Sequence, residues 1–197
     1  MKKWHLLIGM TVIVLLLNAC NKLPIDTNMS EDVAEFSFTT QDNETLSLDD
    51  LHGEWWIADF IFTNCETVCL PMTSNLSKLQ KELEARNLSV QFVSFSVDPD
   101  YDTPEVLREY GQQYEANFDT WSFLTGYDFQ TIKELSIKSF RALLKEPEYG
   151  DDQVMHDTRF FLVNPEGKVI KGYDGVKSDS IDEILNDISI LEKEGRL

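Results

Sequence analysis

Cysteine, histidine and positive charge are scarce in this chain of 197 residues. It has three cysteines and three histidines, and its 17 lysines and arginines face 35 acidic residues, which leaves a formal charge of −18. Binding of nucleic acid is not expected, because phosphates are recognised largely by lysine and arginine. With so few thiols and imidazoles, only a small number of positions can carry thiol or metal chemistry.

Long hydrophobic runs are scarce as well. The apolar run at residues 6–17 is shorter than the roughly 20 residues that span a bilayer, and it follows Lys2 and Lys3, as in an export signal. It ends in Leu-Asn-Ala-Cys at residues 17–20, which resembles the lipobox of bacterial lipoproteins. We therefore expect residues 1–19 to be a signal peptide and Cys20 to carry diacylglycerol, on the extracytoplasmic face of the cell membrane. An uncleaved N-terminal anchor is the alternative.

Removal of the signal leaves 178 of the 197 residues, enough for one well-buried domain. Residues 20–33 are polar, lack periodicity and include Pro24, so they are predicted to be a lipidated tether. No repeat or interior linker divides the remainder, and residues 34–197 are expected to form a single domain.

Strand and helix patterns alternate along this domain. A hairpin comes first, then strands alternate with helices, and an antiparallel pair precedes the last helix. The expected strands are residues 36–39, 45–48, 55–63, 90–97, 121–124, 158–163 and 168–173. The expected helices follow Pro71 and Pro104, then occupy residues 129–135 and 181–191. This order predicts an α/β fold with a central mixed sheet flanked by helices and an N-terminal β-hairpin.

Cys65 and Cys69 stand where the strand at residues 55–63 gives way to a helix. A thiol pair at this place in such a fold indicates a thioredoxin-like domain. The N-terminus of a helix stabilises thiolate, the form that binds metals and attacks disulfides. A purely structural disulfide here would close a very small loop and stabilise little, since about 3 kcal/mol needs a loop of roughly 15 residues. Metal binding or redox chemistry explains the spacing better.

Only one histidine is well placed to join the two thiols. His5 leaves with the signal, and His52 lies in a turn, whereas His156 comes just before the strand at 158–163, whose start approaches the thiol pair in a thioredoxin-like arrangement. Two thiolates and one imidazole suit copper or zinc, and three ligands do not complete a structural zinc site. A hydrogen bond from His156 to the backbone is the competing role.

Three acidic residues lie near these positions in the sequence. Asp59 interrupts an apolar strand, so it is expected to be buried, with a raised pKa or a hydrogen bond. It would act as a proton acceptor for the thiols or as a structural hydrogen-bonding group. Glu66 lies between the cysteines and would disfavour two thiolates while helping to hold a cation. Asp157 would orient the neighbouring His156 or lend it charge.

Several motifs together resemble the SCO/SenC family, in the family's order and from about residue 34 to the C-terminus. They are DFIFTNCETVC at 59–69, SFSVDP at 94–99, LTG at 124–126, and His156 before FLV at 161–163 with Pro165 and Gly167. With the lipobox, the chain looks like a lipoprotein member of the family from a bacterium such as a bacillus.

The resemblance implies a thioredoxin-like domain that binds one copper ion through Cys65, Cys69 and His156. It also implies a metallochaperone, rather than an enzyme, that helps to mature the binuclear copper A centre in subunit II of cytochrome c oxidase. One departure is visible, because Leu70 stands where the family commonly has proline directly after the second cysteine. This change would alter the stiffness of the loop and the cysteine pKa values, but it leaves every implied ligand in place.

An enzymatic reading shares the same site. In it the protein is a thiol–disulfide reductase, Cys65 and Cys69 form a redox-active pair, and the cysteines of the oxidase subunit are kept reduced for copper. Both readings require a thiol reductant as a further partner, because only the dithiol form binds copper well. They differ over His156, which a metal site needs and a simple dithiol reductant does not. The copper oxidation state and the oligomeric state stay open.

Overall fold

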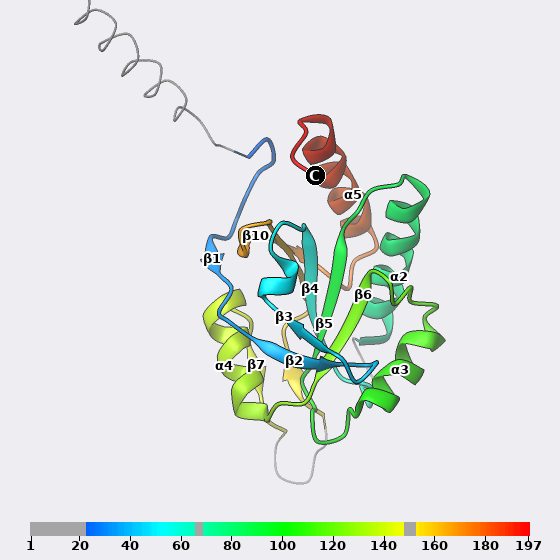
Figure 1. Ribbon diagram of the computed structural model, residues 1–197, viewed down its shortest axis with the longest axis vertical. Coiled ribbons are helices and arrows are strands. Elements are labelled where there is room, and N and C mark those ends of the chain that lie inside the picture. The colour runs from blue at the N-terminus through cyan, green and yellow to red at the C-terminus, as the bar shows by residue number, and fades with distance from the viewer. Residues whose placement is uncertain (1–22, 66–68, 148–152) are drawn as a thin grey trace, which may run out of the picture.

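The computed structural model describes residues 23–65, 69–147 and 153–197, and Figure 1 shows their arrangement. The predicted signal peptide, Cys20 and Glu66 lie outside these ranges. Eight strands form one sheet in the order β1-β10-β9-β4-β5-β6-β2-β3. The strands are β1 (Glu31–Asp32), β2 (Ser37–Thr40), β3 (Thr45–Ser47), β4 (Trp56–Ile61), β5 (Gln91–Ser96), β6 (Trp121–Thr125), β9 (Arg159–Val163) and β10 (Lys168–Asp174). No helix in the described ranges is long and apolar enough to cross a membrane.

The centre of the sheet is parallel and its flanks are antiparallel. β4 pairs in parallel with β5, which pairs in parallel with β6, whereas β9 runs antiparallel to β4 and β10 antiparallel to β9. All six residues of β4 are buried. Continuous burial is typical of a central strand that is covered on both faces, and it explains the unbroken apolar stretch in the sequence. The predicted central mixed sheet is confirmed.

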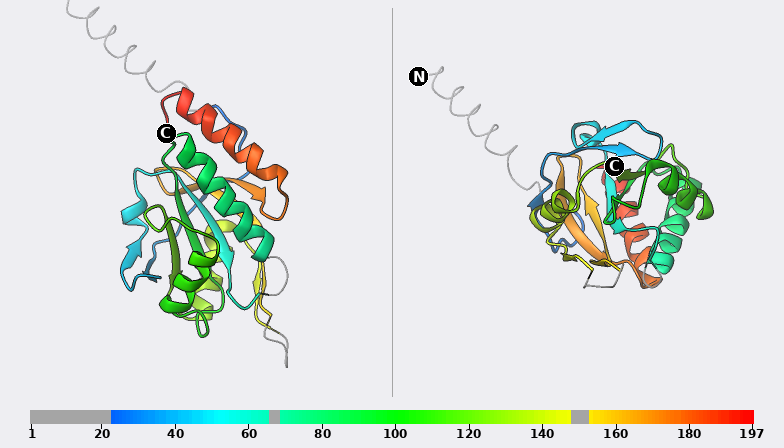
Figure 2. Two further views of the ribbon diagram at one scale, coloured as in Figure 1. Left: turned by 90° about the vertical axis from the view of Figure 1, so that its right-hand side faces the viewer. Right: turned by 90° about the horizontal axis from the view of Figure 1, so that it is seen from below.

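Helices cover both faces of the sheet (Figure 2). The buried apolar residues of α2 (Cys69–Ala85) after Cys69, of α3 (Pro104–Gln113) and of α5 (Asp179–Lys193) pack in one hydrophobic cluster. Those of α4 (Phe129–Phe140) pack in a second, which also contains Cys69. The start of α3 is fixed locally, because Thr103 accepts a hydrogen bond from Val106 N and Pro104 occupies the first turn. The fold is thioredoxin-like, as predicted.

The predicted N-terminal hairpin is formed by β2 and β3, which pair Ser37 with Ser47. β2 also pairs with β6, so the hairpin extends the sheet beyond its parallel part. A short 3-10 helix, η1 (Asp49–Leu51), then leads toward β4. A separate two-stranded sheet joins β7 (Leu144–Lys145) to β8 (Met155–His156), and the sequence pattern did not reveal these short strands.

The described part of the predicted tether, residues 23–33, packs against the folded body. Ile25 and Val33 are buried, and Asn28 and Met29 both donate backbone N–H groups to Ile170 O at 3.1 Å. β1 pairs with β10 along the edge of the sheet. The sequence did not reveal this packing, because widely spaced apolar residues and backbone pairing with an edge strand produce no periodic pattern. Residues 23–33 therefore belong to the ordered part of the chain.

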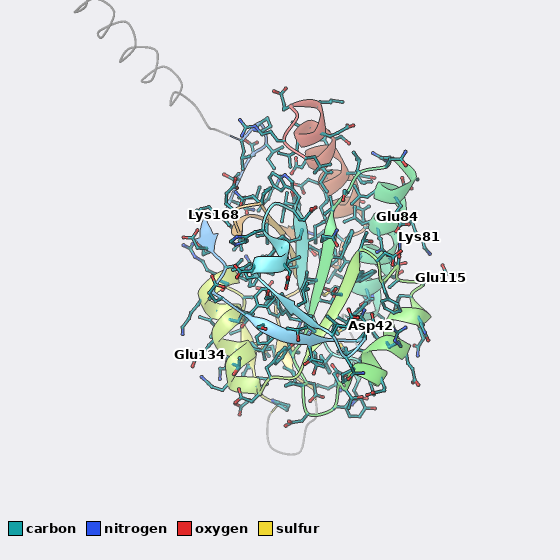
Figure 3. All side chains as sticks on the ribbon, viewed as in Figure 1. Asp42, Lys81, Glu84, Glu115, Glu134 and Lys168 are labelled. Atoms are coloured by element: carbon teal, nitrogen blue, oxygen red, sulfur yellow. The ribbon has the colours of Figure 1, made fainter. Side chains whose placement is uncertain are left out.

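Charged side chains lie around the outside of the molecule, as the labelled residues in Figure 3 illustrate. Lys81 forms an ion pair with Glu115, and Lys138 forms one with Glu134 at 2.8 Å. Such exposed pairs contribute about 0–1 kcal/mol each. Most of the stability therefore comes from the two hydrophobic clusters and the sheet.

Substitution Ile25→Ala tests whether residues 23–33 are part of the folded body. The side chain of Ile25 is 6% exposed, so its truncation is expected to lower the free energy of unfolding by about 2–4 kcal/mol. Urea unfolding of the chain from residue 23 measures this, with the exposed neighbour Thr27→Ala as the control, which should change it by less than about 0.5 kcal/mol. Equal effects of the two substitutions would show that the segment is not packed in solution.

Candidate metal centre

Cys65 follows β4 by four residues and Cys69 is the first residue of α2. The turn that leads to the thiols is tied to the loop after β5 through Asp102, a fully buried carboxylate. Thr63 donates its hydroxyl to Asp102 Oδ1 at 2.5 Å and its backbone N–H at 3.2 Å, while Ser96 donates its hydroxyl to Oδ2 at 2.5 Å. These bonds hold the end of β4 in a defined position.

His156 reaches the thiols from the β7–β8 ribbon. In this ribbon Leu144 pairs with His156, and Leu144 is buried in the same hydrophobic cluster as the two cysteines. A further hydrogen bond, from Gln153 Nε2 to Asn64 O at 3.1 Å, joins the segment before His156 to the turn before Cys65. The sequence placed His156 directly before the main strand; the structure gives it a short strand of its own.

The three predicted ligand side chains come together. The Sγ atoms of Cys65 and Cys69 and one ring nitrogen of His156 all lie within 4.8 Å of one another, and no other Cys, His, Asp or Glu of the described residues joins this group. Both cysteines are buried, and neither is in a disulfide. The Cys69 Sγ atom lies 3.2 Å from His156 Nε2. Two sulfur atoms and one nitrogen atom at this spacing suit a soft metal ion such as copper or zinc.

The tautomer of His156 follows from its second contact. Its Nδ1 atom lies 2.8 Å from the carbonyl oxygen of Asp157, which can only accept, so Nδ1–H is the donor. In the neutral ring Nε2 then carries the lone pair, and that lone pair faces Cys69. A histidine that ligates a metal commonly donates its other N–H to a carbonyl or carboxylate in this way. The backbone hydrogen bond and the ligand role, which the sequence left as competing roles, are compatible here.

The surroundings of Cys69 raise the pKa of its thiol. The main cause is the hydrogen bond with the Cys65 side chain, and burial, which disfavours the charged thiolate, is the second. The N-terminal position in α2 does not outweigh these two effects, contrary to the general expectation for a helix N-terminus. The Cys69 thiol therefore keeps its proton near neutral pH, and a metal ion must displace that proton to bind the sulfur atom.

Asp59 lies in β4 and is 1% exposed. Ser94 donates its hydroxyl to Asp59 Oδ1 at 2.5 Å, and the Ser94 oxygen accepts from Trp121 Nε1 at 2.9 Å. Asp59 Oδ2 has no hydrogen-bond partner among the described residues. Burial raises the pKa of this carboxyl group to about 7, against the opposing effects of Ser94 and of the nearby His156. Both sequence expectations, a raised pKa and a hydrogen bond, are met.

The other side chains considered from the sequence are not part of the ligand group. Arg159 binds the Asp157 carboxylate in a bidentate ion pair, with distances of 2.9 and 2.7 Å, so the group that orients His156 is the Asp157 backbone carbonyl and not its carboxylate. His52 lies beside the turn at Gly167, between β9 and β10. Leu70, which directly follows Cys69, is 51% exposed.

Two supporting sets of residues were missed in the sequence: Asp102 with Thr63 and Ser96, and Ser94 with Trp121. A signal for the serines was present, since Ser94 and Ser96 interrupt an apolar strand as Asp59 does. Polar residues inside a buried strand need hydrogen-bond partners, and these serines bond to the carboxyl groups near the site. Their partners are not neighbours in the pattern of any one element, so the pairing itself was not predictable.

A thioredoxin-like fold with a buried thiol pair and an opposing imidazole defines the class: thioredoxin-like proteins with a Cys-Cys-His centre. The sequence profile described as SCO1/SenC matches residues 26–191. The chain therefore belongs to the SCO1/SenC family. It is 48% identical over 177 residues to the SCO1 protein homolog of Bacillus subtilis, covering 90% of this chain and 91% of that protein.

Solved structures agree with this assignment. A SCO1/SenC family lipoprotein from Bacillus anthracis superposes with a TM-score of 0.80 at 43% identity, covering 87% of this chain and 99% of that one. BsSco, a member of the Sco family of cytochrome c oxidase assembly proteins in which a disulfide switch was identified, gives 0.76 at 45%, covering 84% and 97%. Arabidopsis thaliana ScoI with copper bound gives 0.67 at 28%, covering 79% and 97%.

Substitution Asp59→Asn tests the buried carboxyl group. Because the pKa of Asp59 is about 7 in the folded protein and 3.8 ordinarily, the folded state holds a proton that the unfolded state releases between these pH values. Stability should therefore fall as pH rises through this window, by about 2–3 kcal/mol from pH 5 to 7. Urea unfolding of the reduced protein should show this fall in the wild type and its loss in the variant. The exposed control Asp26→Asn should keep the wild-type profile, and parallel profiles for Asp59→Asn would contradict the assignment.

Proposed function

We propose that this protein binds one copper ion through Cys65, Cys69 and His156 and delivers it during assembly of the binuclear copper A centre in subunit II of cytochrome c oxidase. The observation that carries the proposal is the convergence of two thiols and one imidazole nitrogen within 4.8 Å. Copper is the protein's cargo in this reading, and no reaction is catalysed.

The donor set fits copper better than a structural zinc ion. Structural zinc sites take four protein ligands, whereas three donors come together here in the described residues. Thiolate and imidazole are both good ligands for copper. A site with fewer protein ligands also leaves a coordination position through which an incoming ligand of a partner can attach. The relative from Arabidopsis thaliana with copper bound supports the choice of metal.

The surrounding residues prepare the ligands. The Asp157 carbonyl holds the His156 tautomer with Nε2 unprotonated, and the Phe62 ring meets the imidazole edge to face, with centroids 5.8 Å apart. The buried thiols lose their protons when the metal ion binds, so copper affinity should weaken as pH falls. Burial also shields both sulfur atoms from solvent.

The proposed partners follow from the family and the sequence. BsSco is described as a member of a family of cytochrome c oxidase assembly proteins, which supports the oxidase as the recipient. A thiol reductant is the second partner, because a disulfide between Cys65 and Cys69 would remove both sulfur ligands. The lipobox and the B. anthracis lipoprotein support a lipid anchor at Cys20 on the extracytoplasmic face of the membrane.

A second candidate function is favoured by the reduced state of the neighbouring Cys65 and Cys69 side chains, which form no disulfide here, and by the disulfide switch of BsSco. In it, the Cys65–Cys69 dithiol gives two electrons and two protons to a disulfide of the oxidase subunit. The target becomes a dithiol, and Cys65 and Cys69 become a disulfide that an external thiol reductant must reduce again. This chemistry places no demand on the imidazole of His156.

Copper titration of the reduced chain from residue 23 tests the proposed site. We expect one tight equivalent, seen in sulfur-to-copper charge-transfer absorption, and a large rise in melting temperature. Substitutions Cys65→Ser, Cys69→Ser and His156→Ala should each weaken binding by more than about 100-fold, since even loss of a group that supports a ligand costs about 10–100-fold. His52→Ala, in which the histidine lies far from the thiols in the fold, is the matched control and should bind normally. Weak binding that is indifferent to His156 would contradict the copper site.

The same His156→Ala variant separates the two functions. If the protein is a metallochaperone, the His156→Ala variant should fail to restore oxidase activity in cells that lack the wild-type protein. Its dithiol should still reduce a disulfide in a purified oxidase subunit. Normal oxidase assembly with His156→Ala, together with failure of both cysteine variants, would favour the reductase instead.

A further inference from the structure

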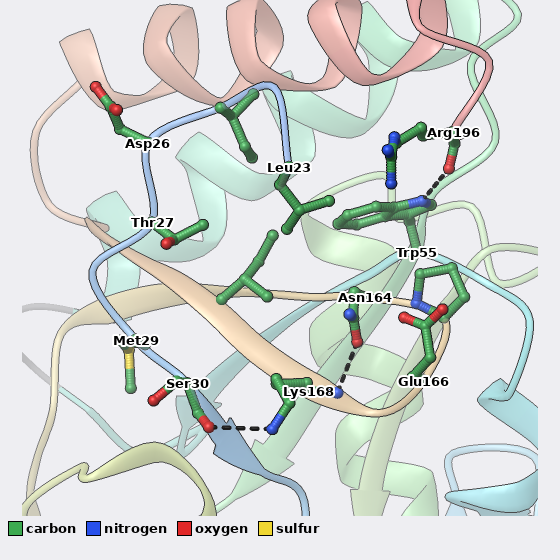
Figure 4. A pocket seen from close by; sticks show the side chains of 13 residues that line it. Leu23, Asp26, Thr27, Met29, Ser30, Trp55, Asn164, Glu166, Lys168 and Arg196 are labelled. Carbon is green, nitrogen blue, oxygen red and sulfur yellow. Dashed lines mark hydrogen bonds between the residues drawn. The ribbon is translucent and has the colours of Figure 1, made fainter. Parts of the chain in front are cut away.

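A groove of about 830 Å³, shown in Figure 4, has none of the three proposed ligand residues in its lining. One wall is the N-terminal segment, with Leu23, Asp26 and Thr27. The opposite walls come from Trp55, just before β4, from the β9–β10 turn, and from Arg196 near the C-terminus. Trp55 Nε1 donates a hydrogen bond to Arg196 O at 2.6 Å, which ties the C-terminus to this end of the sheet.

The groove and the ligand group lie at opposite ends of β4. Trp55 precedes the strand and lines the groove, whereas Cys65 follows the strand and lies in the ligand group. The six residues of β4 rise by about 20 Å at 3.3 Å each. Figure 1 shows the start of the described chain and the C-terminus together at one end of the molecule.

The connection between this end and the anchor is short. Leu23 packs against the hydrophobic cluster, and the following segment is fixed along β10: Asn28 exchanges two hydrogen bonds with the backbone of Gly172, at 3.2 and 2.9 Å, and Val33 N donates to Gly167 O at 2.9 Å. Cys20 precedes Leu23 by three residues. Three Cα–Cα steps span at most about 11 Å, whatever path they take.

The groove also differs in charge from the chain as a whole. Its lining carries two acidic residues, Asp26 and Glu166, and two basic residues, Lys168 and Arg196, so their formal charges cancel. The whole chain carries −18. Anionic phospholipid surfaces repel acidic protein surface within a Debye length, so a groove whose charges cancel is repelled less than the acidic surface of the chain on average.

We propose that the groove face rests on phospholipid head groups and that the Cys65–Cys69–His156 site points away from the membrane. The inference rests on the lipid anchor at Cys20 in the proposed function. Because residues 23–33 are packed, the domain is held close to the bilayer and cannot swing on a long tether. With β4 directed away from the membrane, the ligand group then stands about one strand length, roughly 20 Å, above the groove face. A recipient must present its own metal-binding ligands at that height above the same membrane surface.

Lysine acylation of the full-length lipidated protein tests this orientation. Two exposed lysines report on the two ends of the molecule. Lys193 is the last residue of α5, three residues before Arg196, and Lys145 lies on β7, in the same two-stranded ribbon as His156. The protein is placed in vesicles of phosphatidylglycerol and phosphatidylethanolamine and treated with a water-soluble succinimidyl ester. We expect the acylation rate of Lys193 to fall severalfold relative to the chain from residue 23, which lacks the anchor, while the rate of Lys145 stays unchanged. Equal slowing of both lysines, no slowing, or slowing of Lys145 alone would overturn the proposal.

A linker variant isolates the role of the short connection. A flexible Gly/Ser insertion of about 20 residues between Lys22 and Leu23, with a span of about 25 Å, should restore the acylation rate of Lys193. Continued protection would overturn the short connection as its cause.

Mass spectrometry of the same sample shows whether Cys20 carries diacylglycerol. Its absence would remove the anchor, and this orientation with it, and would leave the copper titration to decide the site. A lipidated protein without selective protection of Lys193 would contradict the orientation alone.

Discussion

Antiparallel pairing of β4 with β9 is the interaction on which the site depends. It sets Trp56 opposite Val163 and Ala58 opposite Phe161, so the end of β4 lies beside the start of β9. The thiols follow the end of β4 and His156 precedes the start of β9. Cys69 and His156 are 87 positions apart in the sequence, and this pairing brings Cys69 Sγ to 3.2 Å from His156 Nε2. The parallel pairing of β4 with β5 adds the second support, because it brings Ser94 to Asp59 and the loop with Asp102 to Thr63.

Burial gives this site its chemical character. In a solvent-exposed loop, two cysteines and a histidine would titrate near their ordinary values, but here burial and mutual hydrogen bonding keep Cys69 protonated. The same burial holds a proton on Asp59 up to a pH of about 7. A bound metal cation opposes both effects, because its positive charge favours the thiolate form of cysteine and the carboxylate form of aspartate. The site is thus stable without metal as a dithiol and is arranged to exchange protons for a soft cation.

The edge of the sheet connects the site to the segment that follows the proposed lipid anchor. β10 pairs with β9 on one side and with β1 on the other, so the strand next to His156 and the segment that leads from Cys20 belong to one continuous sheet. Because the sheet is rigid, the orientation of the anchor segment and the orientation of the ligand group are coupled. The lysine that is expected to meet the membrane and the histidine that is expected to meet copper are then at opposite ends of one rigid unit.

Much of the fold followed from the sequence by itself. Local periodicity and the apolar run of β4 predict the order of strands and helices, the mixed sheet, the hairpin and the positions of Cys65 and Cys69. The proposed ligand set could also be named in advance, because few thiols and imidazoles are present and because the motifs resemble those of the SCO/SenC family. Three features were decided by the tertiary structure alone. They are the direction in which Nε2 of His156 faces, the ion pair between Arg159 and the Asp157 carboxylate, and the packing of residues 23–33 on β10. These depend on contacts between distant segments, whose free energy comes from shared burial and hydrogen bonding rather than from any pattern within one segment.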